Sequence, residues 1–327
     1  MNTNIARRRL LAAATAGVAA GVAAGALPLP GLAQDYPSKP VTLVIPYQGG
    51  ITEQLGRLYA TELEKVLGKS VIVEVKPGAG GVIGGKYAAR APADGYTLVV
   101  TSGLTQETAQ GRFDTFAELE AITAITSQAF LLYVKPDSPI TTLKDYVEYA
   151  KRHPGKLSYG SVGPNTSAHI IGQTLEKSAG IKLVHVPYKG GGAQALAVMS
   201  GELASGYLTS AFIKPYVEGK TLRPIAIVSD QRSEIYPDVP TIVEAGYPDL
   251  APVGSSWFGI FAPKGLPAPV KDALVKAAGT IHDAGPVAAF VRNSGGVLLT
   301  AGPAYATKKT QEDIDFWKTF YRTHGTK

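Results

Sequence analysis

Glycine-rich turns carry the chemistry that this sequence could support. Residues 77–85 read PGAGGVIGG, and they follow the apolar run Val71–Val75. Glycines let backbone N–H groups approach a ligand closely, and a helix that starts there adds positive potential. The segment therefore favours the binding of an anion such as a carboxylate. A tight turn that only packs a helix on a sheet is the structural alternative.

A second turn of this kind spans residues 160–169, which read GSVGPNTSAH. Asn165 or Thr166 could act as a helix N-cap, which would be a purely structural role. Hydroxyl and free N–H groups in the same turn could instead bind a carboxylate. Ser161 does not stand in a G-x-S-x-G motif, so the sequence does not indicate a nucleophile elbow.

The glycine loop also permits a second interpretation, an exported nicotinamide-dependent oxidoreductase that uses residues 78–85. The dinucleotide fingerprint would need glycine where Ile83 stands, and no Asp or Glu ends the following strand to bind ribose. The chain has no cysteine, its five histidines lack ligand spacing, and no carboxylate pair suggests acid–base work. We therefore expect no catalytic residue, no metal site and no cofactor, and keep the oxidoreductase as the alternative.

Two short segments repeat each other. PYQGG spans residues 46–50 and PYKGG spans residues 187–191, and each follows a strand pattern and precedes a helix pattern. In open α/β sheets this carboxyl-end position is where ligands bind. The repetition predicts two half-sites that face one cleft.

The elements that must position these turns form two α/β series. Runs 41–45, 71–75 and 96–100 predict parallel strands with a helix between the first two that ends at Gly68. A second series holds strands 130–134, 156–160, 182–186 and 223–228 and helices 143–152, 167–179 and 193–200. The tail predicts helices 268–284, 286–293 and 303–320, which we expect to cover the first lobe. We expect lobe 1 to comprise 34–133 plus 257–327 and lobe 2 to comprise 134–256, with crossings near 130–136 and 255–262.

The N-terminus has the pattern of an export signal. Arg7, Arg8 and Arg9 precede an Ala/Gly-rich apolar run, and small residues follow up to Ala33. We expect a twin-arginine-like signal peptide over 1–33, cleaved near Ala33, although the general route could also accept it; a retained membrane anchor is the alternative. Without these 33 residues, the chain has 29 basic and 26 acidic residues, and the basic residues form no dense cluster in the sequence. We therefore expect no nucleic-acid partner.

Several motifs in order resemble the Bug/TctC family, the extracytoplasmic solute receptors of tripartite tricarboxylate transporters. The resemblance covers essentially the whole chain after the signal. Its landmarks are YPSKPV at 36–41, PYQGG at 46–50, PGAGG at 77–81, DGYTL at 94–98, PGKLSYGS at 154–161, VHVPYKG at 184–190, PDVPT at 237–241 and SWFG at 256–259.

The resemblance implies a two-lobed α/β periplasmic-binding-protein fold of the Venus-flytrap, type II-like kind, with a cleft between the lobes. It implies a monomeric periplasmic solute-binding protein that holds a small mono-, di- or tricarboxylate or aromatic acid. The ligand would pass to a membrane permease, or a sensor partner would read it. Backbone amides and hydroxyls of both lobes would hold the carboxylate at Gly49–Thr52, Gly78–Gly80, Thr101, Ser102 and 165–169.

The predicted ligand-binding set combines these positions with the two turns. Family members usually have a longer loop where residues 103–116 are compact, and Arg112 lies in that loop, so Arg112 or Lys189 could bind a distal anionic group of the ligand. The full set is Tyr47, Gly49, Gly50, Ile51, Thr52, Gly78, Ala79, Gly80, Thr101, Ser102, Ser161, Asn165, Thr166, Ser167, His169, Gly191 and Arg112.

Overall fold

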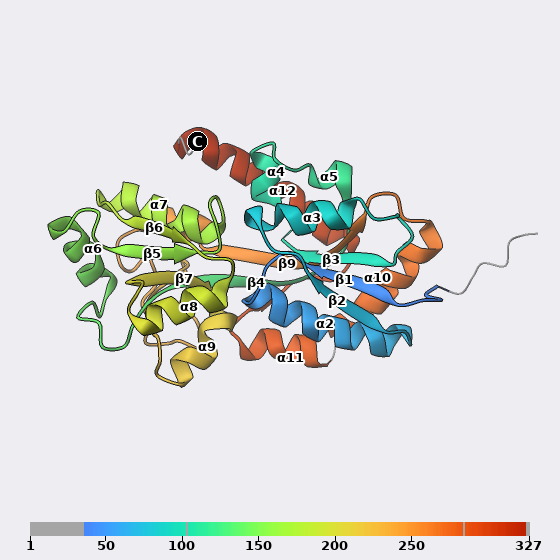
Figure 1. Cartoon of the computed structure of the whole chain (residues 1–327), viewed down its shortest axis with the longest axis horizontal. Helices are drawn as coiled ribbons and strands as arrows, with labels where there is room; N and C mark the ends of the chain where they lie inside the picture. Colours follow the sequence, from blue (N-terminus) through green and yellow to red (C-terminus); the bar gives the residue numbers. More distant parts are fainter. Residues whose placement is uncertain (1–35, 103, 284, 325–327) are drawn as a thin grey trace, which may run out of the picture. The chain divides into compact units, whose positions relative to one another are not determined.

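The computed structural model describes residues 36–102, 104–283 and 285–324, so the predicted signal peptide lies outside the described residues. The chain divides into two compact units, of which the first is Met1–Ser38 and the second is Lys39–Lys327. In the first unit the described residues include a cis peptide bond between Tyr36 and Pro37. The second unit carries the whole described α/β architecture (Figure 1). No helix in the described ranges has the length and apolar character needed to cross a membrane.

The first group of strands is parallel, as the sequence predicts. β1 (Val41–Ile45) pairs in parallel with β2 (Val71–Val75) and β3 (Thr97–Thr101). Between them, α2 (Ile51–Leu67) buries a stripe that includes Leu55, Tyr59 and Leu63, and the left-handed Gly68 ends the helix. A 3₁₀ turn over Ala79–Gly81 leads into α3 (Val82–Ala89). Turns 46–50 and 77–85 therefore both stand at the carboxyl ends of parallel strands.

One long strand joins this group to the second. β4 (Leu119–Val134) pairs antiparallel with β9 (Ser255–Pro263) over positions 119–129, and with β7 (Ser205–Thr209) and β8 (Arg223–Val228) from Phe130 onward. β9 also pairs antiparallel with β3. Figure 1 shows β4 and β9 between strands β1–β3 on one side and β5–β7 on the other. The predicted crossing at 130–136 thus contains the last five residues, 130–134, of a strand that begins at Leu119.

The second group repeats the parallel arrangement. β5 (Ser158–Ser161) pairs in parallel with β6 (Val184–Pro187) and with β7. α6 (Leu143–Arg152) connects β4 to β5, and α7 (Ser167–Ala179), α8 (Gly191–Ser200) and α9 (Ser210–Glu218) follow β5, β6 and β7 in turn. Thr142 and Asp145 form a capping box at the start of α6, which satisfies backbone donors there.

The C-terminal helices serve both groups. α10 (Ala268–Asp283) and α11 (Pro286–Asn293) contact α2, and β10 (Val297–Leu298) pairs with β4. α12 (Pro303–His324) contacts β4 and α4 (Thr105–Ala109), which is followed by α5 (Thr115–Glu118). However, Trp317 and Phe320 of α12 belong to the hydrophobic cluster of Tyr146 and Tyr159 in the second group. We expected the tail helices to cover the first lobe, but α12 also packs against the second group of strands.

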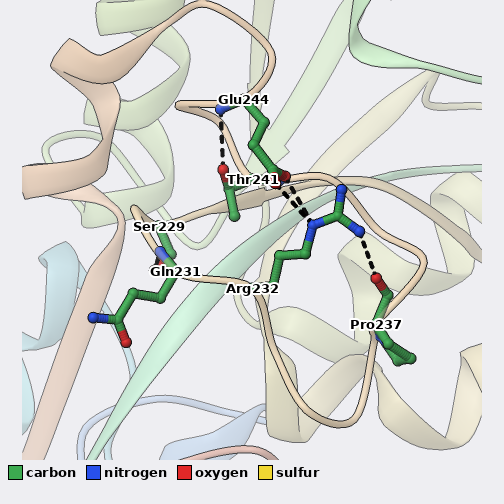
Figure 2. Close-up of polar contacts among 6 residues, drawn as sticks. All are labelled: Ser229, Gln231, Arg232, Pro237, Thr241 and Glu244. Carbon is green, nitrogen blue, oxygen red and sulfur yellow. Dashed lines mark hydrogen bonds and ion pairs between the residues drawn. The ribbon is translucent and has the colours of Figure 1, made fainter.

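The PDVPT motif has a structural role after β8. Arg232 forms an ion pair with Glu244 at 2.9 Å and donates to the carbonyl of Pro237 at 2.8 Å (Figure 2). Thr241 and Glu244 exchange hydrogen bonds, each backbone N–H donating to the other side chain. The Ile242 N–H then donates to the carbonyl of Ile227 in β8 at 2.7 Å. These contacts fasten the irregular segment before the 3₁₀ helix Pro248–Val253 to the sheet.

Candidate functional site

A cavity of about 80 Å³ lies where both groups of strands contribute residues. Nine of the residues predicted from the sequence line it. From the first group these are Tyr47, Gly49, Gly50, Ile51, Thr52 and Ser102, and from the second they are Thr166, Ser167 and Gly191. The structure therefore brings together turns that are more than a hundred positions apart in the sequence.

Helix starts surround the cavity. α2, α7 and α8 begin at Ile51, Ser167 and Gly191, each of which lines it. Within the described chain, none of their N-cap residues forms a side-chain cap hydrogen bond. The first-turn N–H groups of a helix lack intrahelical acceptors and carry the positive end of the helix dipole. The starts of α7 and α8 thus supply positive potential without a cationic side chain, whereas at α2 the first-turn carboxylate of Glu53, which accepts from the Gly49 N–H at 2.6 Å, offsets this potential.

The two repeated turns touch each other. A Cβ atom at Gly190 would collide with the carbonyl oxygen of Gln48, and one at Gly191 would lie 3.5 Å from the Cα of Gly50. This contact brings the starts of α2 and α8 side by side at the cavity, as the sequence repetition predicts. The extended backbone of Gly190 could be adopted by any residue. Glycine is needed there because the close approach of Gln48 leaves no room for a side chain.

Hydrogen bonds support the cavity wall. Gln106 of α4 donates through Nε2 to Oγ of Ser167 at 2.9 Å, which links the first group to the start of α7. Tyr47 donates to the carbonyl of Gly80 at 2.7 Å. Burial, with a smaller effect of the Glu107 charge, raises the pKa of Tyr47, so its phenol stays protonated and able to donate. Gly80 therefore does not line the cavity, but its carbonyl fixes the position of the Tyr47 side chain that does.

The cavity contains no formal charge. No Lys, Arg, His, Asp or Glu is among the described residues that line it. Thr209, at the end of β7, lines the cavity with only 4% exposure, and its Oγ1 has no hydrogen-bond partner among the described residues. A buried hydroxyl without a partner is costly in an empty site and becomes favourable when a ligand supplies one.

The other predicted residues lie outside the lining. Ser161 accepts from the N–H of Gly163 and contacts Nε2 of His185 at 2.7 Å, while Thr101 is fully buried. Arg112 forms an ion pair with Glu107 at 2.5 Å and lines a separate surface cavity beside Lys318. Gly78, Ala79, Gly80 and Asn165 are likewise absent from the lining, as is all of segment 78–85 that the oxidoreductase alternative would use.

His169 lies behind the turn at residues 163–166. Its Nδ1 accepts a hydrogen bond from the N–H of Asn165 at 2.9 Å, and its ring is 4.1 Å from that of His185. Burial, and to a smaller extent the His185 ring, lower the pKa of His169 to about 4. At neutral pH the ring is therefore uncharged, as Nδ1 must be to accept this bond.

Sequence reasoning missed the other half of the lining. These residues come mainly from the crossing strands, from β7 and from α9. Positions 130, 256 and 258 lie in the predicted crossings, which was the available signal for them. The missed residues are Gln106, Phe130, Val162, Tyr207, Leu208, Thr209, Phe212, Ser256 and Phe258, while Ala168 lies within the range 165–169 that the family resemblance implied.

A two-lobed α/β fold with a cavity lined from both sides defines the class of solute-binding proteins. The model of the tripartite tricarboxylate transporter family receptor, TctC, matches residues 55–322. The chain belongs to this family of substrate-binding receptors, which confirms the resemblance and the fold expected from it.

Relatives and solved structures agree with this assignment. The UPF0065 protein in the gbd 5′ region of Cupriavidus necator is 39% identical over an alignment that covers 77% of this chain and 78% of that protein. The periplasmic binding protein BugD superposes with a TM-score of 0.84 and 27% identity, covering 89% of this chain and 99% of BugD. A structure of an R. palustris protein with adipate has a TM-score of 0.82 and 28% identity, with coverage of 89% and 99%.

Proposed function

We propose that this protein is a periplasmic receptor that captures a small organic carboxylate between two lobes and delivers it to the permease of a tripartite transporter. The observation that carries the proposal is the convergence of three helix starts on one uncharged cavity. The lobes would be 34–133 plus 257–327 and 134–256, and the strand partners of β4 change four residues before the first boundary, at Phe130. The protein would be exported by its signal peptide and act as a monomer.

The available contacts are sufficient for useful affinity. A micromolar Kd corresponds to about 8 kcal/mol. A hydrogen bond to a charged group contributes about 1.5–3 kcal/mol, and each helix start adds about 0.3–1 kcal/mol. Four or five amide and hydroxyl contacts to one carboxylate can therefore offset the cost of association without an arginine.

The adipate-bound relative supports a carboxylate as the ligand class. A carboxylate is also the anion that matches the site chemically, since it accepts several N–H and O–H donors at once. The unpartnered Oγ1 of Thr209 and the first-turn N–H groups supply such donors.

One pair of variants tests the role of the helix start. Ser167 is the first residue of α7, a position that tolerates proline because the proline ring fits the first helical turn. Ser167→Pro and Ser167→Ala both remove the Oγ contact with Gln106, but only the proline removes the backbone N–H. In isothermal titration against small organic acids, we expect the Pro variant to bind about 10-fold more weakly than the Ala variant.

Thermal unfolding of the two variants without ligand is the control for folding. Equal affinity of two folded variants for an acid that the wild type binds would contradict a carboxylate held at α7. A wild type that is not stabilised by any mono-, di- or tricarboxylate or aromatic acid would contradict the proposed function as a whole.

A further inference from the structure

One short helix at the cavity cannot hold its position by itself. α4 has five residues, and Leu104 before it has a left-handed backbone with a φ of 53°, which is costly for a residue with a Cβ atom. A helix of this length is not stable without contacts to other elements. α12 supplies such contacts, since it lies beside α4 (Figure 1).

Gln106 of α4 lines the cavity, and the residues on either side of it make polar contacts of two kinds. Glu107 pairs with Arg112, which lies in the loop directly after α4, so this pair does not fix the helix relative to the sheet. Thr105 is 2% exposed, and its Oγ1 donates to Oδ2 of Asp313 in α12 at 2.8 Å. The bond to Asp313 thus ties the start of α4 to another element, one residue before Gln106.

The same carboxylate oxygen holds a second wall of the cavity. Ser256 and Phe258 of β9 line the cavity, and Trp257 between them has its side chain on the opposite face of the strand. Trp257 is 2% exposed, and its Nε1 donates to Oδ2 of Asp313 at 3.3 Å. The SWFG motif therefore faces the cavity with two of its residues and α12 with the residue between them.

Burial makes these two bonds important for Asp313 itself. It raises the pKa of Asp313, and the hydrogen bonds from Thr105 and Trp257, together with the charge of Lys309, lower that pKa in part. A buried carboxylate is costly unless hydrogen bonds or positive charge compensate for the lost water. The two donors thus stabilise the carboxylate, and the carboxylate in turn fixes the two donors.

We propose that Asp313 is a positioning residue for ligand binding, which holds two walls of the cavity from behind. It acts on Gln106 through Thr105, and on the lining part of β9 through Trp257. The inference rests on the proposed function and extends it to the C-terminal helix, which contributes no residue to the described lining.

Substitutions of Asp313 test this role. Asp313→Asn keeps a carbonyl oxygen that can accept both bonds, whereas Asp313→Leu has a similar size and no acceptor. In isothermal titration against an acid that the wild type binds, we expect Asp313→Leu to lower the affinity about 5-fold or more and Asp313→Asn to lower it less than about 2-fold. Asp315→Leu, at an exposed position of the same helix, is the control and should bind like wild type. Thermal unfolding without ligand measures the fold of each variant.

Thr105→Val removes one of the two donors and keeps the size of the side chain, so it tests the α4 branch even if Asp313→Leu does not fold. We expect it to lower the affinity about 3-fold in the wild type and less than about 1.5-fold when Gln106 is already leucine, because the effect passes through Gln106. A change that does not act through Gln106 would give the same factor in both backgrounds.

Three results would overturn the inference and leave the proposed function standing. They are wild-type affinity in folded Asp313→Leu or Thr105→Val, an equal loss of affinity in Asp313→Asn and Asp313→Leu, and a Thr105→Val factor that is the same with and without Gln106. A wild type that binds no organic acid would overturn the proposed function and this inference with it.

Discussion

The contact between the two repeated turns gives the sharpest prediction. Gly190 has an extended backbone, so alanine would fit its conformation, but a Cβ atom there would collide with the carbonyl oxygen of Gln48. Gly190→Ala must therefore push the PYQGG and PYKGG turns apart. Because these turns bring the starts of α2 and α8 to the same cavity, we expect the substitution to weaken ligand binding more than it weakens the fold.

The size of the effect follows from overpacking. Inserting a methyl group into a close-packed contact costs about 1–3 kcal/mol. The two turns come from different strand groups, so they can relieve the collision by separating, and the cost then falls on the ligand-bound arrangement. At 1.36 kcal/mol for each tenfold change, ligand affinity should drop about 5- to 150-fold.

Gly192→Ala is the matched control in the same turn. A Cβ atom at Gly192 meets nothing within 4 Å, and the residue lies in the first turn of α8. We expect this variant to bind like wild type. Isothermal titration measures affinity, and thermal unfolding without ligand measures the fold of each variant. Wild-type affinity in a folded Gly190→Ala protein would refute the close approach of the turns.

Three further predictions concern one side chain that lines the cavity, Gln106, and two that lie outside the lining, Gln128 and His169. Gln106→Leu removes the bond to Ser167 and should weaken ligand binding about 2- to 10-fold in isothermal titration, whereas unchanged affinity would show that the bond does not support the site. Gln128→Leu leaves the first turn of α9 without its acceptor and should lower the free energy of unfolding by about 1–3 kcal/mol in chemical denaturation; an unchanged midpoint would contradict this. The pKa of His169 is lowered to about 4, so the unfolded chain binds a proton that the folded chain excludes, and the free energy of unfolding should fall as pH drops from about 6.5 to about 4. His169→Gln should flatten that decline in denaturant titrations at several pH values, and an unaltered decline would exclude His169 as its source.

Local sequence patterns were sufficient for much of the fold. The β-branched run at β1 and the apolar stripe of α2 with its stop at Gly68 predict their elements within a residue or a few. Residues 119–129 of β4 were missed, and only 130–134 were predicted as a strand. The stability of the missed part comes from pairing with β9, which is more than a hundred positions away.

The residues of the candidate site also fall into those that the sequence could predict and those that it could not. Gly49, Gly50 and Gly191 could be predicted because turns at the carboxyl ends of parallel strands occupy known positions. Phe130 and Phe258 could not, since the face that each presents depends on the register between β4 and β9. Arg112 was predicted as an anion-binding residue because the sequence does not show that Glu107 lies at ion-pair distance from it.

A crystal structure of the protein with a tightly binding acid tests the central claim most directly. The account predicts one carboxylate whose two oxygens lie about 2.7–3.2 Å from first-turn backbone nitrogens of α7 and of α2 or α8. A carboxylate bound instead to Arg112 in the separate cavity, or one in the main cavity with its oxygens turned away from those nitrogens, would contradict it.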